Sequence, residues 1–177
     1  MATFHAVSAV SDAVVHLLES HYNPEDFGGS PLQFRVYMAP DFLAPMDAGV
    51  SVMLYRIYPN AAHLSPSGHF SPVGRRQPPI LALDLHFLIT AWAKEASMQH
   101  EIAGWMLRVL EDAPVLPAAL LNQRFPQTFQ PDETVELILA ELTTDELFRI
   151  WEAVAGHAYQ ISVPYMARNI RIESIQP

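Results

Sequence analysis

The sequence predicts an α+β fold, a mainly antiparallel sheet flanked by helices, in a single domain over residues 1–177. Three stretches place apolar residues three and four positions apart, which is typical of helices that lie on a core. Five other stretches alternate in polarity or are rich in β-forming residues, which is typical of strands. Half of the 177 residues are apolar, enough for one sizeable core without disulfides. In chain order the elements read α-β-β-loop-β-α-β-α-β, which favours helices packed on one sheet.

The first 79 residues predict one helix, two strands and a long loop. Residues 3–21 predict the helix, because one face carries Phe4, Val7, Val10, Val14, Leu17 and Leu18. Residues 32–38 and 50–58 are rich in β-forming residues and predict two strands. Residues 60–79 contain four prolines and two glycines and predict a long loop, of the kind that is usually functional or disordered.

Residues 80–92 predict the central strand of the sheet. One face is wholly apolar and carries Leu81, Leu83, Leu85, Phe87 and Ile89. The other face is mixed and carries Asp84 and His86 among apolar residues. Such a strand is expected in the middle of a sheet that helices cover.

Two helices and a short helical turn are predicted after this strand. Residues 97–111 form an amphipathic helix, and residues 117–123 add the helical turn. The last helix begins at Thr143, because Thr143 and Glu146 have the spacing of a capping box, in which each side chain bonds the other residue's backbone amide. Gly156 is a natural stop for that helix.

Two further strands are predicted in the second half of the chain. Residues 133–142 form the first and residues 160–173 the second. The last strand contains Pro164, and its apolar phase changes between Tyr165 and Ile170. A proline cannot donate to a strand ladder, so we expect an edge position or a β-bulge. An edge there would offer a partner strand a place to pair.

The charge balance excludes several classes of function. The chain has 19 acidic and 10 scattered basic residues, a formal net charge of −9. A nucleic-acid-binding protein needs a clustered basic face, and an anionic membrane surface repels an acidic chain. No apolar run approaches the roughly 18 residues of a membrane span, and there is no cysteine. We therefore expect no nucleic-acid partner and no membrane insertion. We also expect a cytoplasmic location, because no lysine or arginine precedes Arg35 to begin a signal peptide.

Asp84 and His86 form the one pair whose spacing allows acid–base or metal chemistry, because both lie on one face of a strand. A small metal-dependent or acid–base enzyme would need more groups. The sequence has no spacing that supplies a third metal ligand, no serine elbow and no phosphate-binding loop. A polar patch on the less buried face, or a core pair whose hydrogen bonds are satisfied, is therefore favoured. We predict no enzyme activity, no catalytic residue, no metal and no cofactor.

Five segments together resemble one known family. They are residues 52–60 (Val-Met-Leu-Tyr-Arg-Ile-Tyr-Pro-Asn), 78–91 (Pro-Pro-Ile-Leu-Ala-Leu-Asp-Leu-His-Phe-Leu-Ile-Thr-Ala), 102–116 (Ile-Ala-Gly-Trp-Met-Leu-Arg-Val-Leu-Glu-Asp-Ala-Pro-Val-Leu), 147–151 (Leu-Phe-Arg-Ile-Trp) and 159–165 (Tyr-Gln-Ile-Ser-Val-Pro-Tyr). The chain resembles the N-terminal domain of the cap, or tail-terminator, proteins of extracellular contractile injection systems. Residues 78–91 are the most specific part of the resemblance.

The resemblance implies a structural function in a phage-tail-like particle. Such proteins form a six-fold ring at the distal end of the tube and sheath, where they stop polymerisation. The expected partners are further copies of the chain, in a homohexamer, and the inner tube and sheath proteins. The expected location is a particle that assembles in the cytoplasm and can be released. A baseplate or envelope-anchoring adaptor of the same particle is the open alternative.

Low charge agrees with a subunit that neighbours cover, since 16% of the residues are charged against roughly 25% in ordinary domains. Arg75 and Arg76 are the only basic doublet, and they fit a docking tip or an ordinary exposed loop equally well. The candidate interface residues are Arg75, Arg76, Asp84, His86, Pro164, Arg168 and Arg171.

Overall fold

The computed structural model describes residues 1–60, 80–155 and 159–175. Its helices are α1 (Ala6–His21), α2 (Ala96–Asp112), α3 (Ala118–Leu121) and α4 (Thr144–Ala155), with two 3-10 helices, η1 (Pro24–Phe27) and η2 (Ala39–Leu43). Its strands are β1 (Gln33–Val36), β2 (Gly49–Pro59), β3 (Leu81–Trp92), β4 (Val115–Pro117), β5 (Thr134–Leu139) and β6 (Ser162–Ile172). None of the helices in this part of the chain is long and apolar enough to cross a membrane.

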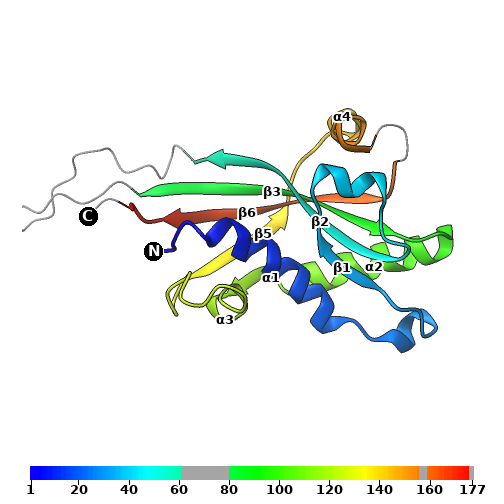
Figure 1. Ribbon diagram of the computed structural model, residues 1–177, viewed down its shortest axis with the longest axis horizontal. Coiled ribbons are helices and arrows are strands. Elements are labelled where there is room, and N and C mark those ends of the chain that lie inside the picture. The colour runs from blue at the N-terminus through cyan, green and yellow to red at the C-terminus, as the bar shows by residue number, and fades with distance from the viewer. Residues whose placement is uncertain (61–79, 156–158, 176–177) are drawn as a thin grey trace, which may run out of the picture.

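The six strands form one sheet in the order β1-β2-β3-β6-β5-β4 (Figure 1). The pair β1 and β2 is parallel, and the other four pairs are antiparallel. The predicted α+β fold with a mainly antiparallel sheet is confirmed. The central position predicted for residues 80–92 is also confirmed, since β3 lies between β2 and β6.

The structure differs from the predicted elements in three details. Phe4 precedes α1, which begins at Ala6, and its side chain is 63% exposed, so it is not part of the helix's apolar stripe. Leu81 begins β3 with an exposed side chain, although its face of the strand is otherwise buried. Residues 115–117 form a strand that the sequence does not predict, because three residues, the last of them a proline, are too few to show alternation.

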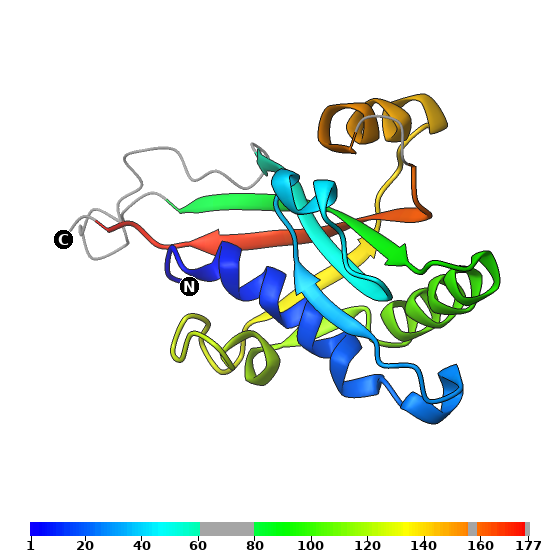
Figure 2. The ribbon, with the colours of Figure 1, turned by 45° about the vertical axis from the view of Figure 1, so that its right-hand side comes forward.

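Helices cover the sheet on both faces (Figure 2). The larger core lies between the sheet and α1, α2 and α3, and includes Val14, Phe87 and Met106. A smaller, aromatic cluster lies on the opposite face, under α4 and η2, and consists of Tyr37, Phe42, Met46, Met53, Leu88, Trp92 and Trp151. The mixed face of β3 is therefore covered only in part.

The predicted capping box at the start of α4 is confirmed. The Glu146 backbone amide donates to Thr143 Oγ1 at 3.2 Å, and the Thr143 amide donates to a Glu146 carboxylate oxygen at 2.9 Å. These two bonds satisfy backbone donors that the first helical turn leaves free. The predicted stop at Gly156 lies outside the described residues.

The predicted edge position of the last strand is wrong, because β6 lies between β3 and β5. Pro164 is tolerated because its carbonyl accepts the Ala140 amide just past the last paired residue of β5, Leu139. The nitrogen and carbonyl of one strand residue point to the same side, so the missing N–H faces the place where β5 has ended. The partner strand that we expected at this edge has no place to pair.

The alternative prediction, a β-bulge in β6, is confirmed. Leu83 pairs with Ile170 while Leu85 pairs with Ala167, so β6 has an extra residue opposite Asp84. Asn169 in this bulge has a φ of 58°, in the left-handed region that asparagine tolerates better than most residues. The extra residue reverses the alternation, which explains the phase change in the sequence.

Candidate functional site

The candidate functional site lies on the face of the sheet that carries Asp84 and His86, in the part that α4 leaves uncovered. Met53 and Leu88 are the last residues of this face that lie in the aromatic cluster under α4. Further from α4, the strand residues on this face are exposed or half-buried, apart from Asp84 and Ala82. Strand register places their side chains on one surface, because residues directly opposite in antiparallel strands share a face. We call this surface the open sheet face, and it consists of Arg56, Tyr58, Asp84, His86, Glu136, Ile138, Met166, Arg168 and Arg171.

Four of the seven candidate interface residues come together on the open sheet face, namely Asp84, His86, Arg168 and Arg171. Pro164 lies on the same side of the sheet but pairs with Leu88, nearer α4. Arg75 and Arg76 lie outside the described residues. The sequence prediction missed Arg56 and Tyr58, although their alternation in the strand at 50–58 places them on one face.

Asp84 holds three chain segments together rather than presenting a free carboxylate. Its Oδ1 accepts the backbone amide of Asn169 at 2.8 Å, in the bulge of β6. Its Oδ2 accepts the side-chain amide of Asn60 at 2.9 Å, just after β2. The side chain is 8% exposed. Within the described ranges, no group of three His, Cys, Asp or Glu residues is placed to hold a metal ion.

Replacing Asp84 by alanine is expected to lower the free energy of unfolding by about 2–3 kcal/mol, because the Asn169 backbone amide and the Asn60 side-chain amide both lose their charged acceptor. Glu136→Ala is the matched control. Its carboxylate lies on the same face and meets Arg168 across 3.8 Å with both side chains exposed, so a change of at most about 1 kcal/mol is expected. Urea denaturation of both variants measures the difference. Equal effects would contradict the assigned role of Asp84.

The surroundings of His86 shift the pKa of its imidazole ring. Burial lowers this pKa, and the guanidinium of Arg56, which pairs with His86 from the neighbouring strand β2, lowers it further. The Asp84 carboxylate opposes both effects. The imidazole ring also packs edge-on against Tyr55, with the ring centroids 6.0 Å apart. The folded protein therefore favours neutral imidazole at this position.

This shift makes His86 a source of acid sensitivity. A histidine with a lowered pKa binds its proton less well in the folded than in the unfolded state, so stability falls as the pH drops through its ordinary pKa of 6.5. His86→Gln is expected to lose less stability than the wild type between about pH 8 and 5. Arg56→Gln is expected to weaken the effect in part. Urea denaturation across this range measures it, and parallel curves for all three proteins would contradict it.

The open sheet face has more basic than acidic groups. Arg56 lies over the ring of Tyr58, with its guanidinium carbon 4.9 Å from the centroid. Arg171 donates from Nε to the side chain of Asn169 at 3.3 Å. Arg168 meets Glu136, whereas Asp84 is buried. The face thus combines cationic, aromatic and thioether side chains, a composition typical of protein interfaces.

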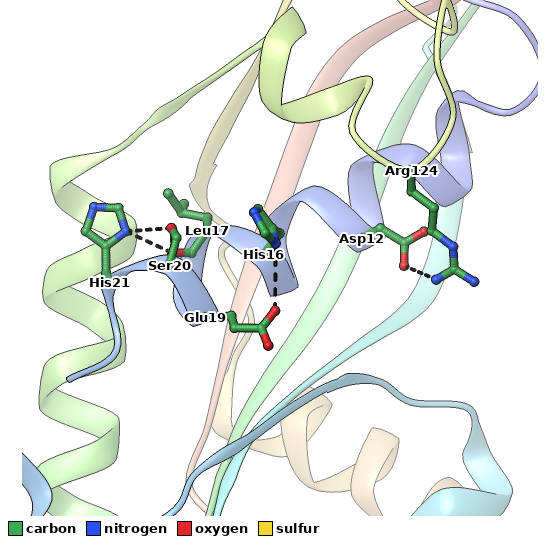
Figure 3. Close-up of polar contacts among 7 residues, drawn as sticks. All are labelled: Asp12, His16, Leu17, Glu19, Ser20, His21 and Arg124. Carbon is green, nitrogen blue, oxygen red and sulfur yellow. Dashed lines mark hydrogen bonds and ion pairs between the residues drawn. The ribbon is translucent and has the colours of Figure 1, made fainter. Parts of the chain in front are cut away.

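The helices on the far side of the sheet have the opposite charge. The segments α1, η1 and α2 carry one basic residue, Arg108, against Asp12, Glu19, Glu25, Asp26, Glu101, Glu111 and Asp112. Asp112 pairs with Arg108 within α2. Asp12 binds Arg124 at 2.8 Å, and Glu19 lies 3.7 Å from His16 (Figure 3). These residues line a groove of about 200 Å³ between α1 and α3. We call α1, η1 and α2 the acidic helix layer.

Comparison with known proteins supplies a family and a fold. Residues 9–177 match the Pvc16 N-terminal domain family. The fold is similar to the sheath/tube terminator of the PVC extracellular contractile injection system in its extended state, with a TM-score of 0.64, 17% identity and coverage of 95% of this chain and 56% of that one. It is also similar to the tube-terminating cap of the anti-feeding prophage, with a TM-score of 0.63, 19% identity and coverage of 95% and 55%. No curated protein sequence matches the chain.

Proposed function

Because the chain belongs to the Pvc16 N-terminal domain family, we propose that it is a structural subunit that ends the tube and sheath of a contractile injection system. The observation that carries the proposal is the family match, which includes all six strands and the three longer helices apart from the first turn of α1. The two terminator structures support it through their fold. The chain spans little more than half the length of each of them, so the terminating activity itself belongs to the proposal.

The proposed assembly is a homohexameric ring whose two sides contact the inner tube and the last layer of sheath. The particle would assemble in the cytoplasm and act after release. The role needs binding surfaces and no chemistry, and the observed part for Asp84 is structural. A baseplate or envelope-anchoring adaptor of the same particle is the second candidate.

Polymerisation of purified tube and sheath proteins tests the proposed activity. Without the chain, the lengths seen by negative-stain electron microscopy are expected to be broad and to increase with time. When the chain is added in molar excess over the growing polymer ends, polymerisation is expected to stop and the mean polymer length to be shorter than without it. Growth that continues unchanged would contradict the proposal, and binding to baseplate components alone would favour the adaptor.

Residues 60–79, with Arg75 and Arg76, are proposed to contact the tube or a neighbouring subunit. Deleting residues 64–76 is expected to leave the unfolding transition of the chain unchanged, because the described helices, strands and both core clusters are built from residues on either side of this segment. The same deletion is expected to impair ring or particle assembly. Thermal unfolding and particle counts measure the two effects, and normal particles from the deletion variant would exclude this role.

A further inference from the structure

We propose that the open sheet face of one copy of the chain docks on the acidic helix layer of the next copy. The inference deepens the proposed function and rests on it, since it assigns the two surfaces through which the ring closes. The occupant of the open sheet face is thus a second copy of this chain.

The first argument is charge complementarity within one molecule. The open sheet face presents Arg56, Arg168 and Arg171, with Glu136 as its only exposed acid. The acidic helix layer carries seven acids and Arg108, and five of the acids are not paired with an arginine, since Arg124 binds Asp12 and Arg108 binds Asp112. Complementary charges of this kind steer association and penalise the wrong orientation, because like charges repel when desolvated.

The second argument is geometric. The open sheet face shares its side of the sheet with α4, and the acidic helix layer lies on the opposite side (Figures 1 and 2). After a first contact, the two copies together therefore keep one free surface of each kind. A head-to-tail contact between unlike surfaces builds a closed ring when the rotation between neighbours divides the circle, whereas a face that pairs with itself stops at a dimer.

The third argument is the chemistry of the open sheet face. Arginine, tyrosine and methionine are enriched at interfaces, and here Arg56, Tyr58 and Met166 lie beside Ile138. The cationic group of Arg56 already lies over Tyr58, so both are held in place before contact. An interface centred on them loses little side-chain entropy on binding.

A charge-swap experiment tests this arrangement with two variants. Arg56→Glu/Arg171→Glu makes the open sheet face acidic. Glu19→Lys/Glu25→Lys/Asp26→Lys/Glu101→Lys reverses the charge of the acidic helix layer, leaving it with three acids and five basic residues. All six side chains are exposed, so both variants are expected to keep the wild-type unfolding transition at pH 8, above the range in which His86 binds its proton. Arg149→Glu on α4, where Arg149 pairs with Asp145 outside both surfaces, is the matched control.

Native mass spectrometry and sedimentation, alone and with tube ends present, measure the oligomers. The wild type and the Arg149 control are expected to form the same ring. Each variant alone is expected to associate at least about tenfold more weakly, because its two surfaces then have like charge, both acidic in the first variant and both basic in the second. An equimolar mixture of the two is expected to restore rings that alternate between them.

Three results would overturn the inference. The first is a wild-type chain that stays monomeric both alone and on tube ends. The second is a full-size ring from Arg56→Glu/Arg171→Glu alone. The third is a mixture that does not reassemble. A restored mixed ring that fails to stop tube growth would leave the inference standing and contradict the proposed terminating function instead.

Discussion

Replacing Trp151 by alanine is expected to lower the free energy of unfolding by about 3–5 kcal/mol, the usual cost of removing a buried tryptophan side chain. Trp151 is 2% exposed and is the residue of α4 that reaches furthest into the aromatic cluster. Its ring meets Phe42 at 5.3 Å, Trp92 at 6.0 Å and Tyr159 at 5.6 Å between centroids. Its Nε1–H donates to Ser162 Oγ at 3.2 Å, on β6.

Two further variants distinguish the loss of the buried Trp151 side chain from other effects of changing α4. Phe148→Ala removes an aromatic ring from the same helix, but that side chain is 46% exposed, so a loss below about 1.5 kcal/mol is expected. Trp151→Phe keeps part of the packing and loses the hydrogen bond to Ser162, and we expect an intermediate loss. Urea denaturation gives the three values. A Trp151→Ala protein as stable as Phe148→Ala would show that α4 is not held by this side chain.

Replacing Gly49 by alanine is expected to cost at least about 3 kcal/mol, because strained backbone and steric overlap add together. Gly49 has a φ of 143°, a conformation that other residues rarely adopt. A Cβ atom there would lie 1.9 Å from the Gln33 carbonyl oxygen and 2.6 Å from the Gln33 nitrogen. Since Gly49 pairs with Gln33, the substitution would push β1 off the parallel edge of the sheet.

Gly104→Ala is the matched control for this substitution. Gly104 lies in α2, and a Cβ atom there meets nothing within 4 Å. Alanine favours a helix over glycine by roughly 0.5–1 kcal/mol, so Gly104→Ala is expected to stabilise the protein. The two substitutions are thus expected to change the free energy of unfolding in opposite directions in the same denaturation experiment. Two variants that are both as stable as the wild type would contradict the close approach of β1 to β2.

Periodic segments of the sequence predict their elements well. The alternation of Leu83, Leu85, Phe87 and Ile89 identifies a buried strand, and Thr143 with Glu146 marks the start of α4, because both patterns are local. Pro164 suggests an edge because a proline cannot donate to a neighbouring strand. In the structure β5 ends beside Pro164, so no strand residue there needs a donor from the proline. This arrangement depends on tertiary pairing and cannot be predicted from the segment alone. The parallel pairing of β1 with β2 is likewise not encoded in either segment alone.

The candidate site was less accessible to sequence reasoning. Asp84 and His86 are two residues apart on one strand, so their common face follows from the strand period. Arg168 and Arg171 join that face through the register of β6 against β3, and the bulge at Asn169 shifts this register by one residue. The role of Asp84 depends on the same bulge, since the Asn169 amide that it accepts comes from a residue 85 positions away. The acidic helix layer becomes a surface only when α1 and α2 pack on the same side of the sheet.

In the proposed function this chain occupies the end of the particle away from the baseplate, as a ring that closes the tube and sheath. Cryo-electron microscopy of particles that carry a tagged copy of the chain tests it most directly. The expected result is one ring of tagged density at the distal end of each particle, in contact with the last layers of tube and sheath. Tagged density at the baseplate, along the tube or in no fixed place would contradict the claim.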